Sequence, residues 1–287
     1  MKRMYRVTLR FFYGVWERIS EGHFGLVAAG VAFYAMFAVF PGIAAVVAIW
    51  GLMADPVVIA GYLGVAERFL PPEARNLVHD QVMGLVNAPR STLGWATVVS
   101  LGVALYSARN GVSALIQGLN VVHRAEAHGF FYGMARDFML TIALIGALIA
   151  AMATIVVVPI LFSYMPIDQY APRLTRFLPW GVMFLLVLTC LSILFRYGPN
   201  VPHAMRSRWF SLGVIFATMA WAGVSVAFSL YLENFNSYNR IYGSIGAAII
   251  LMMWLYLSVW AVLAGGAINA ELEQRRVVRR QMGRGTL

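Results

Sequence analysis

Thirty consecutive residues near the end of the chain, 241–270, carry no charged side chain. Five further uncharged runs precede them, and the six runs cover residues 22–54, 91–108, 138–167, 177–195, 209–232 and 241–270. A helix needs about 20 mostly apolar residues to cross a hydrocarbon core about 30 Å thick, and it satisfies its backbone polar groups within the segment. The pattern therefore predicts an all-α, polytopic membrane protein with six transmembrane helices.

The composition argues against other classes of protein. Hydrophobic residues make up 61% of the chain and charged residues 12%, whereas a soluble domain has about 25% charged residues. The runs are too long and continuous for outer-membrane β-strands, which alternate over about ten residues. The single cysteine, Cys190, lies in the fourth run, so an intramolecular disulfide and a thiol-based metal or redox centre are excluded. We expect Cys190 to serve in packing, and we predict no cofactor.

The basic residues predict the orientation, because cytoplasmic flanks of membrane helices carry an excess of Lys and Arg. With the amino terminus inside, sixteen of the 22 Lys and Arg residues fall on the cytoplasmic side. We therefore expect a multi-pass protein of the bacterial inner membrane with both termini in the cytoplasm. The same rule accounts for most of the net charge of +10, so nucleic acid is not an expected partner. Residues 1–274 form the expected transmembrane domain, and residues 275–287 a basic cytoplasmic tail.

Two segments that flank the first span have an amphipathic pattern. Residues 4–19 place apolar side chains among Arg6, Arg10 and Arg18, which is typical of a helix that lies in the membrane interface. Residues 55–90 are too charged to span, yet apolar side chains recur at helical spacing from Leu77 to Val86. We expect one or two amphipathic periplasmic helices there, between the first and second spans. These helices either rest on the membrane surface or cap a cavity.

A polar stripe continues the second span. Polar residues at spacings of three, four and three share one helix face, and Arg109 borders them. Such groups in hydrocarbon must face protein or water, because an unsatisfied polar group costs several kcal/mol there. The stripe either lines a cavity, or it forms helix-to-helix hydrogen bonds or emerges into the cytosol. With one residue of the sixth span, the candidate polar path consists of Arg109, Asn110, Ser113, Gln117, Asn120 and Asn269.

Basic residues at the membrane faces are candidate contacts for lipid headgroups. Each Arg beside an anionic membrane surface gains about 1 kcal/mol. Anionic membrane lipids are therefore the expected partners, with a homo-oligomer or an envelope protein as a further partner. For Arg196 we keep two interpretations, a headgroup anchor and a substrate contact. The candidate headgroup contacts are Arg196, Tyr197, Arg275, Arg276, Arg279 and Arg280.

Two carboxylates, Glu271 and Glu273, follow the sixth span. Residues two apart on a helix point to different faces, so an acid–base pair is not expected of them. We predict instead that each pairs with a nearby Arg.

Several segments resemble the YihY/virulence factor BrkB family of bacterial inner-membrane proteins, formerly labelled ribonuclease BN-like. The segments that carry the resemblance are Ala32-Phe33-Tyr34 with Phe40-Pro41, residues 111–120, Arg196-Tyr197-Gly198-Pro199-Asn200, residues 228–256 and Asn269-Ala270-Glu271-Leu272-Glu273. The resemblance runs over about residues 10–275. It implies six membrane-spanning helices with cytoplasmic ends, and it implies no defined activity or catalytic residues.

The older ribonuclease label has no support in the residues. Phosphodiester cleavage uses metals held by clustered carboxylates and histidines, or histidines as acid and base. The five histidines are scattered along the chain, and only His123 and His128 lie close in sequence, at a spacing that is poor for one helix face. The chain also has no Gly-rich phosphate loop of the form G-x-x-x-x-G-K-[ST] and no G-x-S-x-G motif. We therefore expect no enzyme activity.

Two functional hypotheses remain. In the first, the protein handles lipid or transports a solute across the envelope, driven by a gradient, by a partner, or passively. In the second, it is a membrane scaffold that organises envelope partners without transport. A closed bundle whose polar stripe is fully used by internal hydrogen bonds favours the scaffold.

Overall fold

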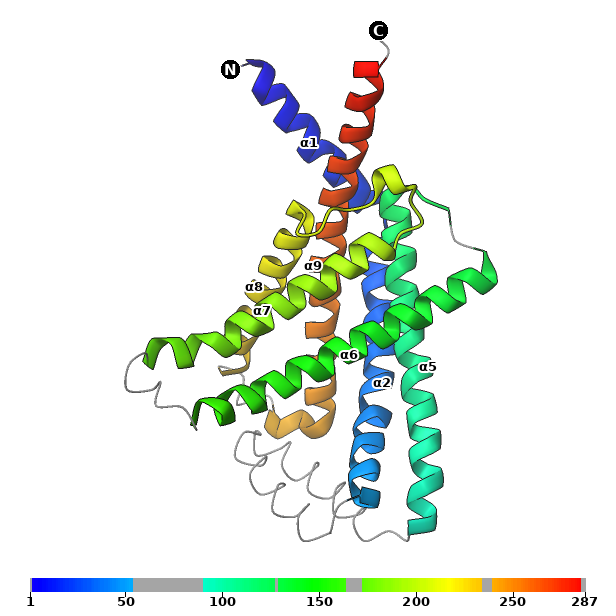
Figure 1. The fold of residues 1–287 in the computed structure, drawn as a ribbon, viewed down its shortest axis with the longest axis vertical. Helices are drawn as coiled ribbons and strands as arrows, with labels where there is room; N and C mark the ends of the chain where they lie inside the picture. Colours follow the sequence, from blue (N-terminus) through cyan, green and yellow to red (C-terminus); the bar gives the residue numbers. More distant parts are fainter. Residues whose placement is uncertain (1, 54–89, 127–128, 164–171, 234–238, 285–287) are drawn as a thin grey trace. The chain divides into compact units, whose positions relative to one another are not determined.

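The computed structural model describes residues 2–53, 90–126, 129–163, 172–233 and 239–284, which are almost entirely α-helical (Figure 1). No strand occurs in these ranges. The elements are α1 (Lys2–Glu21), α2 (Phe24–Met53), α5 (Arg90–His123), α6 (Phe130–Ser163), α7 (Pro172–Tyr197), the 3-10 turn η2 (His203–Met205), α8 (Leu212–Glu233) and α9 (Asn239–Arg284).

The predicted all-helical class is confirmed. Four helices contain stretches long and apolar enough to cross a membrane, and α7 contributes a shorter apolar stretch, Gly181–Tyr197. The four stretches are Phe24–Ala45, Phe131–Ala150, Leu212–Tyr231 and Ala248–Val278. The expected periplasmic helices fall on residues 54–89, which lie outside the described residues. Helix α9 continues through the predicted tail to Arg284, so residue 274 is not a helix boundary.

The described residues divide into two compact units. Among the described residues, the first unit comprises residues 2–29, 112–126, 129–163, 172–226 and 257–284, and the second comprises residues 30–53, 90–111, 227–233 and 239–256. In the second unit, the rings of Phe33 and Phe37 on α2 lie 4.7 Å apart and both side chains are exposed. Exposed aromatic and aliphatic side chains suit a helix surface that faces lipid chains rather than water. The candidate site lies wholly in the first unit.

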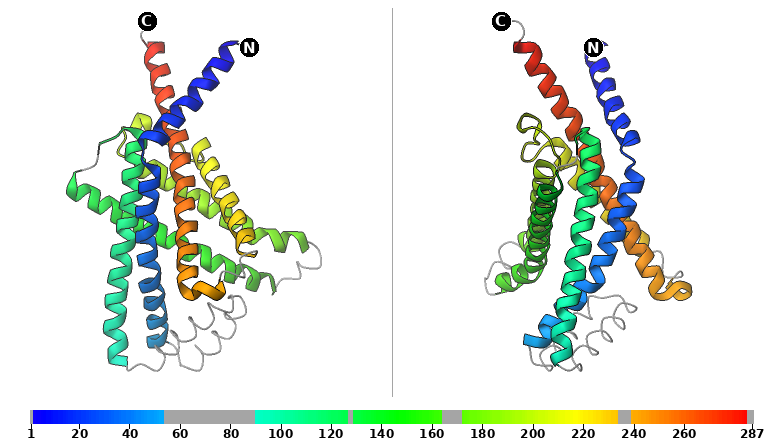
Figure 2. Two further views of the ribbon diagram at one scale, coloured as in Figure 1. Left: turned by 180° about the vertical axis from the view of Figure 1, so that it is seen from behind. Right: turned by 90° about the vertical axis from the view of Figure 1, so that its right-hand side faces the viewer.

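Small residues bring α8 and α9 close together in the first unit. A side chain on Gly265 would collide with the backbone oxygen of Gly213 and with Ala217. Small residues at such positions let two helix backbones approach closely. The contact places the start of α8 against the polar part of α9. Helices α6 and α7 lie side by side in the same unit (Figure 2).

Helix α5 ends in a Schellman motif. The N–H of Arg124 donates to the carbonyl of Val121, and the N–H of Ala125 donates to the carbonyl of Asn120. Arg124 occupies the left-handed position of the motif, with a φ of 52°. Glycine is the usual residue at this position because a Cβ is unfavourable there.

Arg124→Gly is therefore expected to unfold at a higher temperature than Arg124→Ala. Both variants remove the charged side chain, but only glycine relieves the left-handed backbone, which costs a residue with a Cβ roughly 1 kcal/mol. The measurement is thermal unfolding of the two variants in the same detergent. Equal unfolding temperatures would show that the motif carries no strain at this residue.

Candidate functional site

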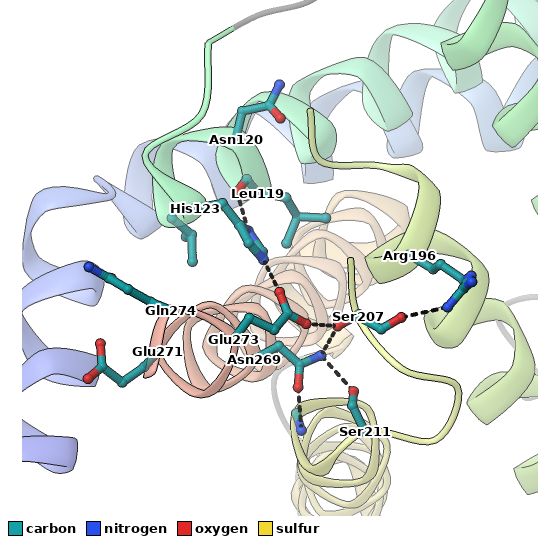
Figure 3. Close-up of polar contacts among 12 residues, drawn as sticks. Leu119, Asn120, His123, Arg196, Ser207, Ser211, Asn269, Glu271, Glu273 and Gln274 are labelled. Atoms are coloured by element: carbon teal, nitrogen blue, oxygen red, sulfur yellow. Dashed lines mark hydrogen bonds and ion pairs between the residues drawn. The ribbon is translucent and has the colours of Figure 1, made fainter. Parts of the chain in front are cut away.

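A buried polar network joins α9, the end of α5, the start of α8 and the segment between α7 and α8 (Figure 3). We call residues 198–211 the connecting loop. Asn269 and Glu273 supply the α9 side of the network, and because they are four residues apart they share one face of the helix. The other side chains of the network are His123, Ser207 and Ser211.

Asn269 ties the connecting loop to α8. Its side chain is 1% exposed, and its amide nitrogen donates to the hydroxyls of Ser207, at 2.9 Å, and Ser211, at 2.7 Å. Its amide oxygen accepts the backbone N–H of Gly213 at 2.9 Å. The first N–H groups of a helix have no partner within the helix. Asn269 therefore caps α8 from a neighbouring helix.

Glu273 extends the network to α5. Its Oε1 accepts the hydroxyl proton of Ser207 at 2.5 Å, and its Oε2 lies 3.6 Å from Nε2 of His123. The Nδ1 of His123 lies 2.8 Å from the carbonyl oxygen of Leu119. The side chains of His123 and Glu273 are 1% and 4% exposed. Hydrogen bonds thus join Glu273 to the first turn of α8 through Ser207 and Asn269, and the 3.6 Å contact with His123 brings the network to the end of α5.

Two further contacts hold the connecting loop. Arg196, at the end of α7, donates from Nη1 to the backbone carbonyl of Ser207 at 3.0 Å, and its guanidinium lies 5.6 Å from the ring centre of Trp209. At the other end of the loop, the backbone N–H of Asn200 donates to the side-chain oxygen of Asn120 at 2.8 Å. Asn120 of α5 and Asn269 of α9 therefore bind opposite ends of the connecting loop.

A second cluster lies on the opposite side of α9, where Glu271 and Gln274 point away from the network (Figure 3). Arg18 of α1 is 4% exposed; its Nη1 donates to the carbonyl of Val122 at 2.5 Å, and its Nε donates to Glu271 at 3.3 Å. Its Nη2 donates to Gln274. Arg275 donates from Nε to Glu271 at 2.7 Å. The predicted pairing with Arg is confirmed for Glu271, whereas Glu273 pairs with Ser207 and His123 instead.

An open groove of about 1280 Å³ runs between α1 and the end of α9. Phe12, Tyr13 and Trp16 are exposed along its α1 side. Four arginines and two glutamates line it: Arg10, Arg18, Arg124, Arg275, Glu17 and Glu271. We call this feature the α1–α9 groove. It combines an aromatic wall with a net positive charge.

Arg124 stays positively charged in this groove. The hydrogen bond that it donates to Glu21, at 2.9 Å, raises the pKa of its guanidinium above the ordinary value. The neighbouring carboxylate of Glu17, at 3.3 Å, acts in the same direction. Because the pair is about half exposed, solvent screens it and its contribution to stability is small.

The family is established by comparison with known proteins. The sequence model of the virulence factor BrkB family matches residues 15–286. The chain belongs to the virulence factor BrkB family. This agrees with the resemblance found in the sequence and confirms a membrane protein.

BrkB-family relatives cover most of this chain. A ribonuclease-like protein of Bacillus subtilis, YfkH, is 29% identical over 256 residues, which are 87% of this chain and 90% of the relative. UPF0761 membrane proteins of Xanthomonas campestris and Xanthomonas oryzae are 27% identical over 94% and 92% of this chain. The chain spans 62% and 61% of the length of these two relatives. No solved structure matches this BrkB-family chain.

The structure places the candidate polar path of this BrkB-family protein in separate local contacts. Arg109 donates to its neighbour Asn110 at 3.2 Å, and Gln117, which is exposed, lies 3.5 Å from Ser113 on the same helix face. Asn120 and Asn269 are buried and bind the connecting loop and the start of α8, as described above. The predicted stripe therefore contains exposed residues as well as buried ones that bind other parts of the protein.

The candidate headgroup contacts also separate into two sets. Arg196 binds the connecting loop, and Tyr197 beside it is 43% exposed. Arg275 lines the α1–α9 groove, and Arg276 is exposed one residue later. Arg279 and Arg280 lie in the last turns of α9, and their side chains are outside the described part of the chain.

Several members of the network could not be predicted from the sequence. Ser207 and Ser211 lie in an irregular loop or at its end, where no periodicity marks a residue as buried. The one available signal was the spacing of Asn269 and Glu273, two polar residues one helical turn apart. Within the described ranges, no three His, Cys, Asp or Glu side chains are grouped so that they could hold a metal ion.

Proposed function

We propose that this protein is a six-span protein of the bacterial inner membrane that handles anionic phospholipids, and that their headgroups bind in the α1–α9 groove. The observation that carries the proposal is the lining of the groove. It places Arg10, Arg124 and Arg275 beside three exposed aromatic side chains, whereas Arg18 is buried and bonded to Glu271 and Val122. Arginine binds phosphate well because its planar guanidinium can donate two parallel hydrogen bonds.

Charge complementarity favours an anionic occupant over a zwitterionic one. The lining holds four arginines and two glutamates, and with Glu21, which binds Arg124, the groove keeps an excess of one positive charge. Tyr and Trp side chains are enriched at the depth of lipid headgroups because their rings have an apolar body and a polar edge. Tyr13 and Trp16 supply this chemistry on the α1 wall.

The positive-inside rule supports the placement of this groove at the cytoplasmic leaflet. Both α1 and the end of α9 belong to segments with an excess of arginine, and cytoplasmic leaflets carry a negative surface potential. Under the proposal, Arg275 and Arg276 lie beside the bound lipid, and Arg279 and Arg280 follow them in the sequence of α9. The proposed six spans follow from the uncharged runs, and the proposed location of both termini in the cytoplasm follows from the distribution of Lys and Arg.

A second function, a scaffold without transport, is favoured by one specific observation. Asn120 and Asn269 are the buried members of the candidate polar path. Their side chains form hydrogen bonds with the connecting loop and the start of α8. A polar path that conducts lipid or solute needs some of these groups to face the cargo. A scaffold needs only their structural role.

The first test is lipid binding by Arg10→Gln. Removing one guanidinium from the groove is expected to weaken binding of short-chain phosphatidylglycerol about five-fold, which corresponds to about 1 kcal/mol per Arg. The measurement is isothermal titration of the full-length protein in uncharged detergent. Phosphatidylcholine of the same chain length should bind weakly to both proteins.

Arg208→Gln is the matched control, because Arg208 is an exposed arginine outside the groove lining. Equal affinities of wild type, Arg10→Gln and Arg208→Gln would contradict the proposed site. Reconstituted vesicles then separate handling from scaffolding. Movement of a labelled lipid between leaflets that depends on the protein supports handling, and lipid binding without such movement supports the scaffold.

A further inference from the structure

Two buried acceptor atoms face each other at the centre of the polar network. The Nε2 of His123 and the Oε2 of Glu273 lie 3.6 Å apart, and neither has a hydrogen-bond partner. Both side chains are more than nine-tenths buried. A buried polar atom without a partner is unfavourable, so an arrangement with two of them needs an explanation.

The other nitrogen of His123 fixes the tautomer. Its Nδ1 lies 2.8 Å from the carbonyl oxygen of Leu119, and a carbonyl oxygen can only accept. The Nδ1 therefore carries a hydrogen. In neutral histidine the Nε2 is then an unprotonated acceptor, and it faces a carboxylate oxygen that is also an acceptor.

We infer that His123 and Glu273 form a buried site that binds one proton, taken up from water. The proton lies either on Nε2, which gives an imidazolium–carboxylate pair, or on Oε2, which gives a carboxylic acid that donates to a neutral imidazole. Both forms hold the same number of protons, and both turn the repulsive contact into an attractive one. The proton therefore joins the end of α5 to α9.

Most charged groups on the surrounding elements have partners of their own. On α1 and α9, Arg18 binds Glu271 and the carbonyl of Val122. On α7, Arg196 binds the carbonyl of Ser207. Arg124 binds Glu17 and Glu21, and Arg275 binds Glu271. In the connecting loop, Arg206 is half-buried and Arg208 is exposed.

The start of α8, Leu212–Val226, has no titratable side chain. The Glu273 carboxylate is thus balanced by the bound proton rather than by an arginine in this part of the chain. The same carboxylate accepts from Ser207, whose hydroxyl in turn accepts from Asn269. Loss of the proton would leave a buried charge facing a lone pair, and it would weaken the attachment of the connecting loop.

Glu273→Gln provides the sharpest test. The amide oxygen of glutamine can accept from Ser207, and its NH₂ group can donate to the Nε2 of neutral His123. The variant therefore provides a donor for Nε2 of His123 and an acceptor for Ser207 without the extra proton, and it is expected to fold. The measurement is ¹⁵N NMR of histidine-labelled, full-length protein in nanodiscs near neutral pH, combined with infrared spectroscopy of carboxylic acids.

Wild type is expected to show His123 protonated on both nitrogens, or else an infrared band of a protonated carboxyl that disappears in Glu273→Gln. In Glu273→Gln, His123 should carry only the Nδ1 hydrogen. The His123 resonance is assigned as the one that changes in Glu273→Gln and stays in His203→Gln, where an exposed histidine is removed. A neutral His123 in wild type without a Glu273-dependent carboxyl band would overturn the inference.

Discussion

Asn269→Leu is expected to destabilise the folded protein by about 3–5 kcal/mol. Leucine has the same number of side-chain heavy atoms as asparagine and branches at the same carbon, so the substitution leaves no cavity and the effect arises mainly from lost hydrogen bonds. Three polar groups lose a hydrogen bond: the hydroxyl of Ser207, which keeps its bond to Glu273, the hydroxyl of Ser211 and the backbone N–H of Gly213. Each buried group left unsatisfied costs about 1–3 kcal/mol, and partial re-pairing of the two serines keeps the sum below the maximum.

The measurement is thermal or denaturant-induced unfolding of the purified protein in detergent. Gln117→Leu is the matched control, since Gln117 is an exposed amide on α5 that lies 3.5 Å from Ser113. Its replacement is expected to change the stability by no more than about 0.5 kcal/mol. If Asn269→Leu were as stable as Gln117→Leu, Asn269 would not hold the connecting loop.

The helices were predictable because a membrane imposes a simple physical requirement. Every backbone polar group in hydrocarbon must be satisfied locally, so a long uncharged run has one main structural solution, a helix. The runs 22–54 and 241–270 accordingly lie on α2 and α9. The opposite faces of Glu271 and Glu273 were predictable for the same reason, because helical geometry alone determines them.

The network was not predictable, because its partners are far apart in sequence. Ser207 and Glu273 are 66 residues apart, and Asn120 and Asn200 are 80 residues apart. His123 is an example: the histidine nearest to it in sequence is His128, but the residue that faces it in the fold is Glu273. Local pattern indicates which residues share a helix face, and only the packing of helices shows which faces meet.

Arg18 is a second residue whose contacts could not be predicted from the local sequence. The amphipathic pattern of residues 4–19 predicts a surface position for its arginines, yet Arg18 is 4% exposed and binds a backbone carbonyl of α5. A basic residue near the end of an amphipathic helix gives the same sequence signal whether it meets lipid or protein. The contact with Val122, 104 residues away, decides between the two.

Gly265→Leu is expected to prevent α8 and α9 from packing and to reduce the yield of folded protein severely. A Cβ at this position would collide with the backbone oxygen of Gly213 and with Ala217, and a backbone cannot rotate away as a side chain can. Overpacking costs about 1–3 kcal/mol where side chains can adjust, so a backbone collision is expected to exceed that range. Asn269 lies one turn further along α9, so separation of the helices would also break its bonds to α8.

Gly223→Leu on α8 separates this packing effect from the substitution itself. A Cβ at Gly223 meets no atom within 4 Å, and leucine is favoured over glycine in a helix by roughly 0.5–1 kcal/mol. This variant should therefore be at least as stable as wild type, measured by monodisperse yield and unfolding temperature in the same detergent. Equal yields of Gly265→Leu and Gly223→Leu would mean that close approach of α8 and α9 is not required, and that Asn269 reaches Gly213 in some other way.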